Sequence, residues 1–382
     1  MKRKVFNDRW LRLISIVCCA LMLFLFLPGC ENKQQGPGES MSENVDEESE
    51  QARQTVTVID SIGRRVEVPT NIERVANLCP ESGHAMAMFG MGDRIVASTN
   101  GMKRDILLTQ MYPNILDASK PKTSGVINIE ELLNCKPDLV FVKMDTAQSD
   151  TEMEKMDRFG LPFLVVDYSN IKGQQHAVEM MGKAVGASEK AKEYIDYFEK
   201  CIGLVQPRID KIPKGERITI YHSVNEAVRT DASGTLAAEW TEIAGAINVS
   251  VDKELKFIED KHYASLEEIL LWDPEIILVS DPDVGDYIMT NKQWAPLRAV
   301  KNGKVWTLPN GLTRWGHPTS LETPLAILWT AQKLYPELFA DIDIKSEIKY
   351  FYETFFNYHI TDEMADQILS GEGMRISKIE PS

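Results

Sequence analysis

The sequence has none of the short motifs that identify the commonest enzyme sites. GxxxxGK[ST], HExxH, CxxC and GxSxG are all absent from its 382 residues. The segment Gly90-Met91-Gly92 begins like a dinucleotide-binding loop, but Ile95 stands where that loop needs a third glycine. The motifs therefore give little support to an enzyme.

Cysteine and basic residues are also scarce. Beyond residue 30 the chain has Cys79, Cys135 and Cys201, an odd number that allows at most one disulfide, and we expect three buried, reduced thiols. The formal charge is −15, and without the five Lys or Arg and the one acid of the first 30 residues the chain has 37 basic against 56 acidic side chains. This acidic balance argues against a nucleic-acid partner.

The first 30 residues predict an export signal. Five Lys and Arg precede an apolar run from Leu13 to Leu27, which ends at Pro28-Gly29-Cys30. The run has about 15 residues, fewer than the ~20 of a membrane-spanning helix, so we expect cleavage of a lipoprotein signal and acylation of Cys30. Pro28 beside the cleavage site leaves an uncleaved membrane anchor as the alternative. In both cases the rest of the chain lies outside the cytoplasm.

Residues 31–54 are rich in Gln, Glu, Ser and Gly and contain no aromatic residue. Such a segment cannot bury a core, so we expect a disordered acidic tether. Together with Cys30, it predicts a protein that is lipid-anchored to the outer face of the cytoplasmic membrane.

Two stretches 137 residues apart share one pattern. NIEELLNCKPDLVFVK begins at Asn128 and SLEEILLWDPEIILVS at Ser265, and each predicts a short helix, a proline that stops it and a buried strand. A unit repeated once at this spacing indicates two similar lobes. Glu130 and Glu267 occupy the same place at the helix start, where a carboxylate interacts favourably with the helix dipole. They have either this local role alone or a partner with matched cations.

Strand and helix signals alternate on both sides of a purely helical segment. A hairpin is expected near residue 55, strands and helices alternate to residue 167, and no strand signal occurs from Gly173 to Lys211, where Pro207 should kink or end a long helix. We predict an α/β fold of two Rossmann-like lobes, joined by a single long helix, with a ligand cleft between the lobes. The expected boundaries are 55–170 for the N-terminal lobe, 171–212 for the connecting helices and 213–382 for the C-terminal lobe.

Several segments together resemble the substrate-binding lipoproteins of ABC importers for iron complexes, haem and cobalamin. They are VIDSIGRRVEVP, MAMFGMGDRIVAS, INIEELLNCKPDLV, YASLEEILLWDPEIILV and GHPTSLETPLAILWTAQKLYPELF. In that family a glutamate on each lobe meets an arginine on each half of the permease, which implies this role for Glu130 and Glu267. The resemblance further implies a monomer without enzymatic activity or intrinsic cofactor, whose partners are an ABC permease with its cytoplasmic ATPase. The implied ligand is a ferric siderophore or similar iron chelate, with cobalamin, haem or another metal complex as alternatives.

Ligands of facing α/β lobes contact the loops that follow the strands. In the loop Asn310–His317, Arg314 offers a fixed cation, Trp315 a flat apolar face and His317 a possible metal ligand, a set that suits an anionic, ring-bearing metal chelate. Packing of Trp315 on a strand and capping of a helix by His317 are the structural alternatives. Further candidates are His84, Lys103, Tyr221 and Arg229, of which His84 is either an iron or haem ligand or a hydrogen-bonded helix residue.

Two other classes of function stay open. One is a lipid-anchored sensor or adhesion module that uses the lobes as an interaction surface. The other is a metal-dependent hydrolase built from His84, His222, Asp281 and Asp283, although their spacing matches no known ligand pattern. An importer component binds a small metal complex without turnover, a sensor needs a protein partner, and an enzyme consumes its ligand.

Overall fold

The computed structural model describes residues 54–371 and 374–376, which belong to one compact unit. The expected signal 1–30 with Cys30, and the tether up to residue 53, lie outside these residues. Across the described ranges, none of the helices combines the length and the apolar composition needed to span a bilayer.

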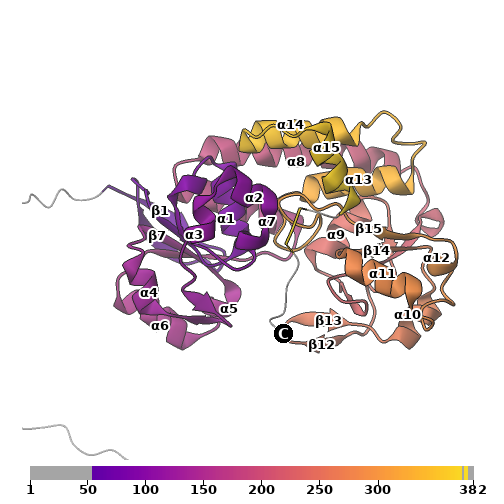
Figure 1. The fold of residues 1–382 in the computed structure, drawn as a ribbon, viewed down its shortest axis with the longest axis horizontal. Coiled ribbons are helices and arrows are strands. Elements are labelled where there is room, and N and C mark those ends of the chain that lie inside the picture. The colour runs from indigo at the N-terminus through magenta and orange to yellow at the C-terminus, as the bar shows by residue number, and fades with distance from the viewer. Residues whose placement is uncertain (1–53, 372–373, 377–382) are drawn as a thin grey trace, which may run out of the picture. The chain divides into compact units, whose positions relative to one another are not determined.

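The N-terminal lobe is built on a parallel sheet with the strand order β4-β3-β7-β8 (Figure 1). The inner strands are buried along almost their whole length, as is usual for a parallel sheet covered by helices. The strands are β3 (Val75–Asn77), β4 (Ile95–Ala97), β7 (Leu139–Lys143) and β8 (Phe163–Val166), with the antiparallel hairpin β1 (Thr55–Ile59) and β2 (Arg65–Pro69) before them and the pair β5 (Lys122–Thr123) and β6 (Val126–Ile127) between. The helices are α1 (Pro80–Met88), α2 (Ile106–Met111), α3 (Asn114–Asp117), α4 (Ile129–Asn134), α5 (Met144–Ala147) and α6 (Asp150–Arg158).

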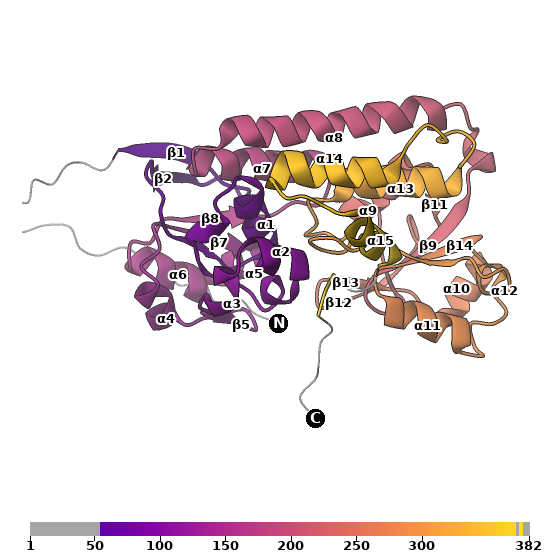
Figure 2. The same cartoon turned by 45° about the horizontal axis from the view of Figure 1, so that its top comes forward.

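A pair of long helices connects the two lobes. α7 (Ile171–Ala184) packs on α8 (Ser188–Ile209), and α8 also packs on α9 (Leu236–Ile243) and α13 (Thr323–Leu334) of the C-terminal lobe (Figure 2). Pro207 was predicted to kink or end the helix. In the structure α8 continues through Pro207 and ends two residues later. Pro207 lies in the last turn, where it removes the N–H that would bond the carbonyl of Gly203, and little of the helix follows for it to disturb.

The C-terminal lobe repeats the parallel sheet with the order β11-β9-β14-β15. Its strands are β9 (Thr219–Ser223), β11 (Ile247–Asn248), β14 (Ile276–Val279) and β15 (Val305–Thr307). The sequence analysis did not foresee the small antiparallel sheet of β10 (Arg229–Thr230), β12 (Lys256–Ile258) and β13 (Lys261–Tyr263). The remaining helices are α10 (Leu266–Trp272), α11 (Pro282–Thr290), α12 (Arg298–Lys301), α14 (Ile344–Phe356) and α15 (Asp362–Ser370).

The repeated unit takes the same local structure in both lobes. It forms α4 and β7 in one lobe and α10 and β14 in the other, and both strands are inner strands of their sheets. Lys136 and Asp273 each directly precede the proline of the repeated unit, and they adopt positive φ angles of 45° and 38°. The two helices thus end in the same left-handed turn, and the predicted α/β fold with two lobes is confirmed.

The three cysteines of the described residues are buried and unpaired, as expected. Burial raises the pKa of Cys79, and it raises the pKa of Cys201 to about 12. These thiols stay protonated at neutral pH and act as small apolar side chains.

Candidate ligand pocket and docking face

A pocket of about 680 Å³, a size common for small-molecule sites, is lined by many charged side chains. The N-terminal lobe contributes Arg104, and the C-terminal lobe contributes the loops after β9, β14 and β15. The polar and charged lining residues are Arg104, Asn225, Glu226, Arg229, Lys261, Ser280, Asp281, Asp283, Asp286, Asn310, Arg314 and Arg375. We call this cavity the arginine pocket.

Three of the pocket's arginines have no carboxylate partner. Within the described residues, no ion pair is formed by Arg104, Arg229 or Arg314. All three side chains are half-buried. Of the pocket's acidic residues, Asp281 is also half-buried and its charge raises the pKa of Arg314, whereas Glu226, Asp283 and Asp286 are exposed. Half-buried cations without counter-ions are unfavourable. An anion in the pocket would relieve this penalty.

Two of these arginines, Arg104 and Arg314, have lowered pKa values. Burial and the charge of Arg375 lower the pKa of Arg314 to about 10, and the same two causes lower the pKa of Arg104. Arg314 donates from Nη1 to Asn225 Oδ1, and its buried Nε finds no hydrogen-bond partner among the described residues. At least one of its donors therefore has no protein acceptor among the described residues.

A buried carboxylate fixes the loop that carries Arg314. Glu322 accepts hydrogen bonds from Leu312 N (3.2 Å), Thr313 N (2.9 Å), Trp315 Nε1 (2.9 Å) and Tyr352 OH (2.5 Å). Burial raises the pKa of Glu322 to about 7, against the lowering effect of these donors. The loop is thus held by side chains of α13 and α14 and presents Arg314 from a fixed position.

At Gly316 the same loop approaches Trp240 closely. Gly316 has a φ of +71°, and a Cβ there would lie 2.4 Å from the Trp240 ring. Trp240 Nε1 donates to Gly316 O (3.1 Å), so the ring and the loop backbone hold each other. Only glycine fits this position.

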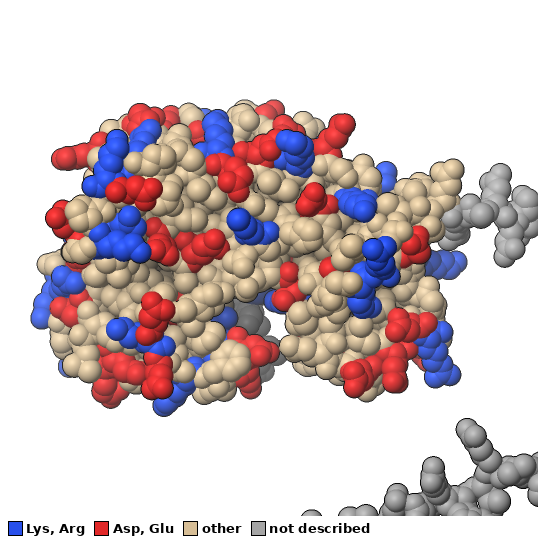
Figure 3. Space-filling model, turned by 180° about the vertical axis from the view of Figure 1, so that it is seen from behind, with Lys and Arg blue, Asp and Glu red and all other residues tan. Residues whose placement is uncertain are grey.

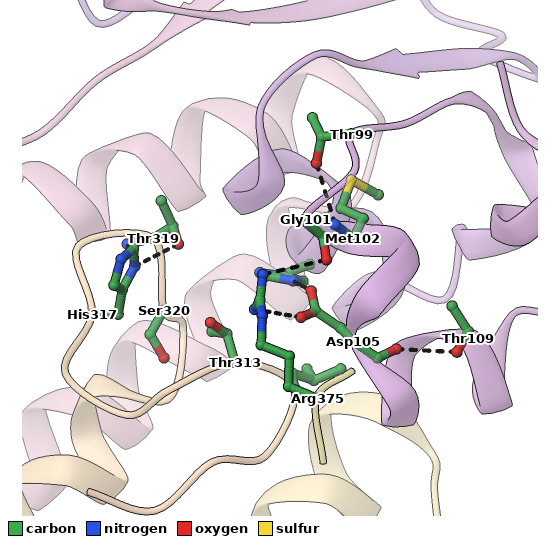
Figure 4. A network of polar contacts seen from close by, with 12 residues as sticks. Thr99, Gly101, Met102, Asp105, Thr109, Thr313, His317, Thr319, Ser320 and Arg375 are labelled. Carbon is green, nitrogen blue, oxygen red and sulfur yellow. Dashed lines mark hydrogen bonds and ion pairs between the residues drawn. The ribbon is translucent and has the colours of Figure 1, made fainter. Parts of the chain in front are cut away.

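His317 lies at the end of this loop, near Arg375 and Asp105 (Figure 4). Its Nδ1 accepts from Thr319 Oγ1 (3.0 Å) and Thr319 N (3.3 Å). Burial lowers the pKa of His317 well below its usual value, and the charges of Arg314, Lys143, Arg375 and Arg229 add to this effect. His317 is therefore a neutral imidazole at physiological pH. The charges of Arg229 and Arg314 thus act on His317, although His317 does not itself line the arginine pocket.

Two other candidates lie in the protein core instead. Tyr221 is fully buried, packs near Trp294 and donates its hydroxyl to Ala227 O (3.1 Å). Trp315 is also fully buried, with its indole N–H used by Glu322. Neither side chain has a free polar group or surface for a ligand, so the interpretation of both as ligand contacts needs correction.

Lys103 and His84 have protein partners. Lys103 donates to Leu116 O (2.7 Å) and Ala118 O (2.5 Å), which ties it to the end of α3 rather than to the arginine pocket. His84 is buried, with Nε2 3.0 Å from Asp105 Oδ2. His84 is thus connected to the pocket residue Arg375 only through Asp105, which contacts both side chains.

Sequence reasoning missed Arg104 and Arg375. Arg104 directly follows the candidate Lys103 but was not itself considered, and Arg375 follows the last helix, where no motif marks it. Arg375 Nη1 lies 2.5 Å from Asp105 Oδ1, a contact between residues 270 positions apart. No local sequence signal could have found this pair.

The groups proposed for a metal hydrolase do not come together. His84 pairs with Asp105, and His222 Nδ1 lies 2.6 Å from Asp231 Oδ2. Over the described part of the chain, no cluster of three or more His, Cys, Asp or Glu side chains has a geometry that would hold a metal ion. The hydrolase alternative therefore loses the site on which it depended.

Glu130 and Glu267 occupy equivalent exposed positions. Each is the second residue of its helix, α4 or α10, after an N-cap side chain that accepts a backbone N–H, namely Asn128 or Ser265. Figure 1 shows both helices at the side of their lobes away from α8. On the face drawn in Figure 3, Lys and Arg are interspersed with Asp and Glu, without a large area of one sign.

These features define a class: a binding protein with two α/β lobes, long connecting helices and a charged pocket. Residues 75–312 match the family described as periplasmic binding protein, and the chain belongs to this family. The family resemblance that the sequence motifs indicated is thereby confirmed.

Several relatives indicate what members of the family bind. The chain is 25% identical over 324 residues to the molybdate-binding protein MolA of Haemophilus influenzae, covering 78% of this chain and 90% of MolA. The structure of molybdate-bound MolA superposes with a TM-score of 0.72 at 23% identity, covering 80% of this chain and 99% of that one. The ABC transporter substrate-binding lipoprotein YvrC of Bacillus subtilis is 22% identical, with 86% of this chain and 98% of YvrC covered. The Fe(3+)-citrate-binding protein YfmC of Bacillus subtilis is also 22% identical, with 77% of this chain and 89% of YfmC covered.

Proposed function

We propose that this protein is the substrate-binding component of an ABC importer and that it captures an oxygen-rich anion in the arginine pocket. The main support is the group of three half-buried arginines without carboxylate partners, Arg104, Arg229 and Arg314. Guanidinium groups match the oxygens of carboxylates and oxyanions in charge and geometry. The protein binds its ligand and releases it unchanged.

The ligand class includes metal oxyanions and anionic chelates of ferric iron. MolA and YfmC are relatives whose names place molybdate and ferric citrate within this class. A ferric siderophore with carboxylate or other anionic groups fits the same chemistry, whereas cobalamin without net charge gains little from the arginines. The proposal therefore keeps the expected iron chelate and adds the oxyanion.

Delivery of the ligand requires that the protein is attached to the membrane and docks on its permease. We propose that Cys30 carries the lipid, that residues 31–54 form the tether, and that the monomer docks on its permease through Glu130 and Glu267. YvrC, described as a lipoprotein, supports the anchor. Replacement of Cys30 by Ser should release the protein from membranes, as followed by fractionation and by mass spectrometry of the N-terminal peptide.

The deciding experiment is identification of the ligand. Absorption spectroscopy and native mass spectrometry of protein purified from its own cells reveal a retained ligand. Calorimetric titrations with molybdate, tungstate, ferric citrate and cyanocobalamin then compare the classes. We expect one-to-one binding of at least one of the anions, weaker at high salt because the site is electrostatic. Binding of cyanocobalamin alone, or of none of the four, would contradict the proposal.

A further inference from the structure

A short C-terminal segment, residues 374–376, forms backbone hydrogen bonds with the N-terminal lobe. Ile106 N donates to Met374 O (3.1 Å), and Ile376 N donates to Arg104 O (2.9 Å). Between these bonds, Asp105 and Arg375 pair in antiparallel register. Met374 is 3% exposed and belongs to the main hydrophobic core. The segment, which follows α15 of the C-terminal lobe, is therefore docked like a short strand. We call it the strap.

A buried ion pair lies at the centre of the strap. Arg375 Nη1 is 2.5 Å from Asp105 Oδ1, and Nη2 donates to Gly101 O (3.4 Å). The other carboxylate oxygen of Asp105 is 3.0 Å from His84 Nε2. The Asp105 side chain is 1% exposed, and a carboxylate at such depth needs partners to offset its lost hydration. Figure 4 shows Arg375 directed at Asp105 and Gly101 from the strap.

The same guanidinium also lines the arginine pocket. Two of its five N–H donors serve Asp105 and Gly101, which leaves donors for a ligand. Its charge lies close enough to Arg104 and Arg314 to affect both. The strap thus connects the two lobes and brings a fourth arginine to a pocket in which three others form no ion pair among the described residues.

We propose, on the basis of the anion-binding function above, that the strap positions Arg375 as a ligand-contacting residue and that strap docking and anion binding stabilise each other. The anion relieves repulsion between Arg375 and the other arginines, so it favours the docked strap. The docked strap in turn supplies one more cation, so it favours the anion. Thermodynamic linkage makes the two effects equal in free energy.

Three variants separate the charge of Arg375 from its position. Arg375→Ala removes both, Arg375→Lys keeps the charge and loses the guanidinium fork, and Asp105→Asn keeps Arg375 and removes the charge that holds it. The matched control is Arg208→Ala. Arg208 also forms an arginine–aspartate pair, with Asp341 at 2.5 Å, and does not line the pocket.

Two measurements follow each variant: calorimetric affinity for molybdate and ferric citrate, and deuterium exchange of peptides that contain Ile106 and Ile376. In the wild-type protein we expect the bound anion to slow exchange at both sites. We expect Arg375→Ala to bind at least 10-fold more weakly and to exchange faster, Arg375→Lys to be intermediate, and Asp105→Asn to lose several-fold in affinity with faster exchange. Arg208→Ala should change neither measurement.

The outcomes distinguish this inference from the proposed function. If Arg314→Ala loses affinity while Arg375→Ala binds like the wild type, the strap has no role in binding and the inference fails alone. If Asp105→Asn exchanges faster but keeps full affinity, the coupling is absent and the inference is again overturned. If the wild-type protein binds neither anion, the proposed function fails first and the coupling fails with it.

Discussion

The two lobes are alike where they carry Glu130 and Glu267 and unlike where their strands end. In both lobes the repeated unit begins with a capped helix and leads to an inner strand. In the N-terminal lobe this strand ends at Lys143, whose pKa is raised chiefly by the nearby Glu81. In the C-terminal lobe, Arg229 and Arg314 line the arginine pocket, and the pKa of Arg314 is lowered by burial and by Arg375 although the charges of Asp281 and Asp105 oppose this shift.

This difference separates two tasks of one scaffold. A docking face that meets two similar halves of a permease benefits from equivalent positions, so the helix starts match. A ligand has no such symmetry, so the loops after the strands are free to differ, and most of the pocket's cations come from the C-terminal lobe. The following predictions test this division.

The largest effect is expected at Arg314. Its replacement by Ala removes a half-buried cation whose Nε has no partner among the described residues, and loss of a desolvated ionic contact costs about 3 kcal/mol, roughly 100-fold in affinity. Lys143→Ala is the matched change in the N-terminal lobe, where Glu81 already compensates the charge, and should cost less than about 5-fold by the same estimate. Calorimetry with the bound anion compares them. Equal losses would remove the asymmetry between the lobes.

The next effect concerns the matched acids. The double variant Glu130→Lys and Glu267→Lys should lower uptake of radiolabelled ligand by about 10-fold or more in cells, because two favourable ionic contacts become repulsive. Ligand affinity of the purified variant should stay unchanged, since both residues are exposed on α4 and α10, away from the pocket lining. Each single variant should show a similar partial loss. A large loss from one alone would contradict the equivalence of the two positions.

The sequence predicts the fold better than the pocket, for physical reasons. The repeated helix, proline and strand are local patterns, so the two lobes follow from them. Tyr221 was considered as a residue of a loop that follows a strand, but β9 extends from Thr219 to Ser223, two residues further, and places Tyr221 in its middle, where it is buried in the core. A shift of two residues was enough to turn a core residue into an apparent ligand contact.

The sequence analysis identified candidate polar residues only where they lie in a loop that follows a predicted strand. Arg229, Arg314 and His317 follow strands, as the general rule for α/β folds requires. Arg375 reaches the pocket through its pairing with Asp105, which depends on the packing of the whole molecule. Long-range contacts of this kind leave no periodic trace in the sequence.

A smaller effect is expected from pH. His317 is held neutral because burial and nearby cations lower its pKa, and a bound anion should raise that pKa again. The complex then binds more protons than the free protein, so affinity should increase by up to about 10-fold as pH falls from 7 to 5.5. Titration in buffers of different ionisation enthalpy measures the proton uptake. In His317→Gln both the uptake and the pH dependence should decrease.

The smallest effect on binding is expected at Tyr221, which tests whether the C-terminal core influences affinity apart from its loops. Tyr221→Phe leaves Ala227 O without the hydroxyl donor at 3.1 Å, so the free energy of unfolding should fall by about 1 kcal/mol in urea titrations. Affinity for the anion should stay within about twofold of wild type, because the ring still fills its place beside Trp294 and the loop of Arg314 is held by Glu322 instead. A clear loss of affinity in this stable variant would mean that the strands, and not the loops alone, set the position of the arginines.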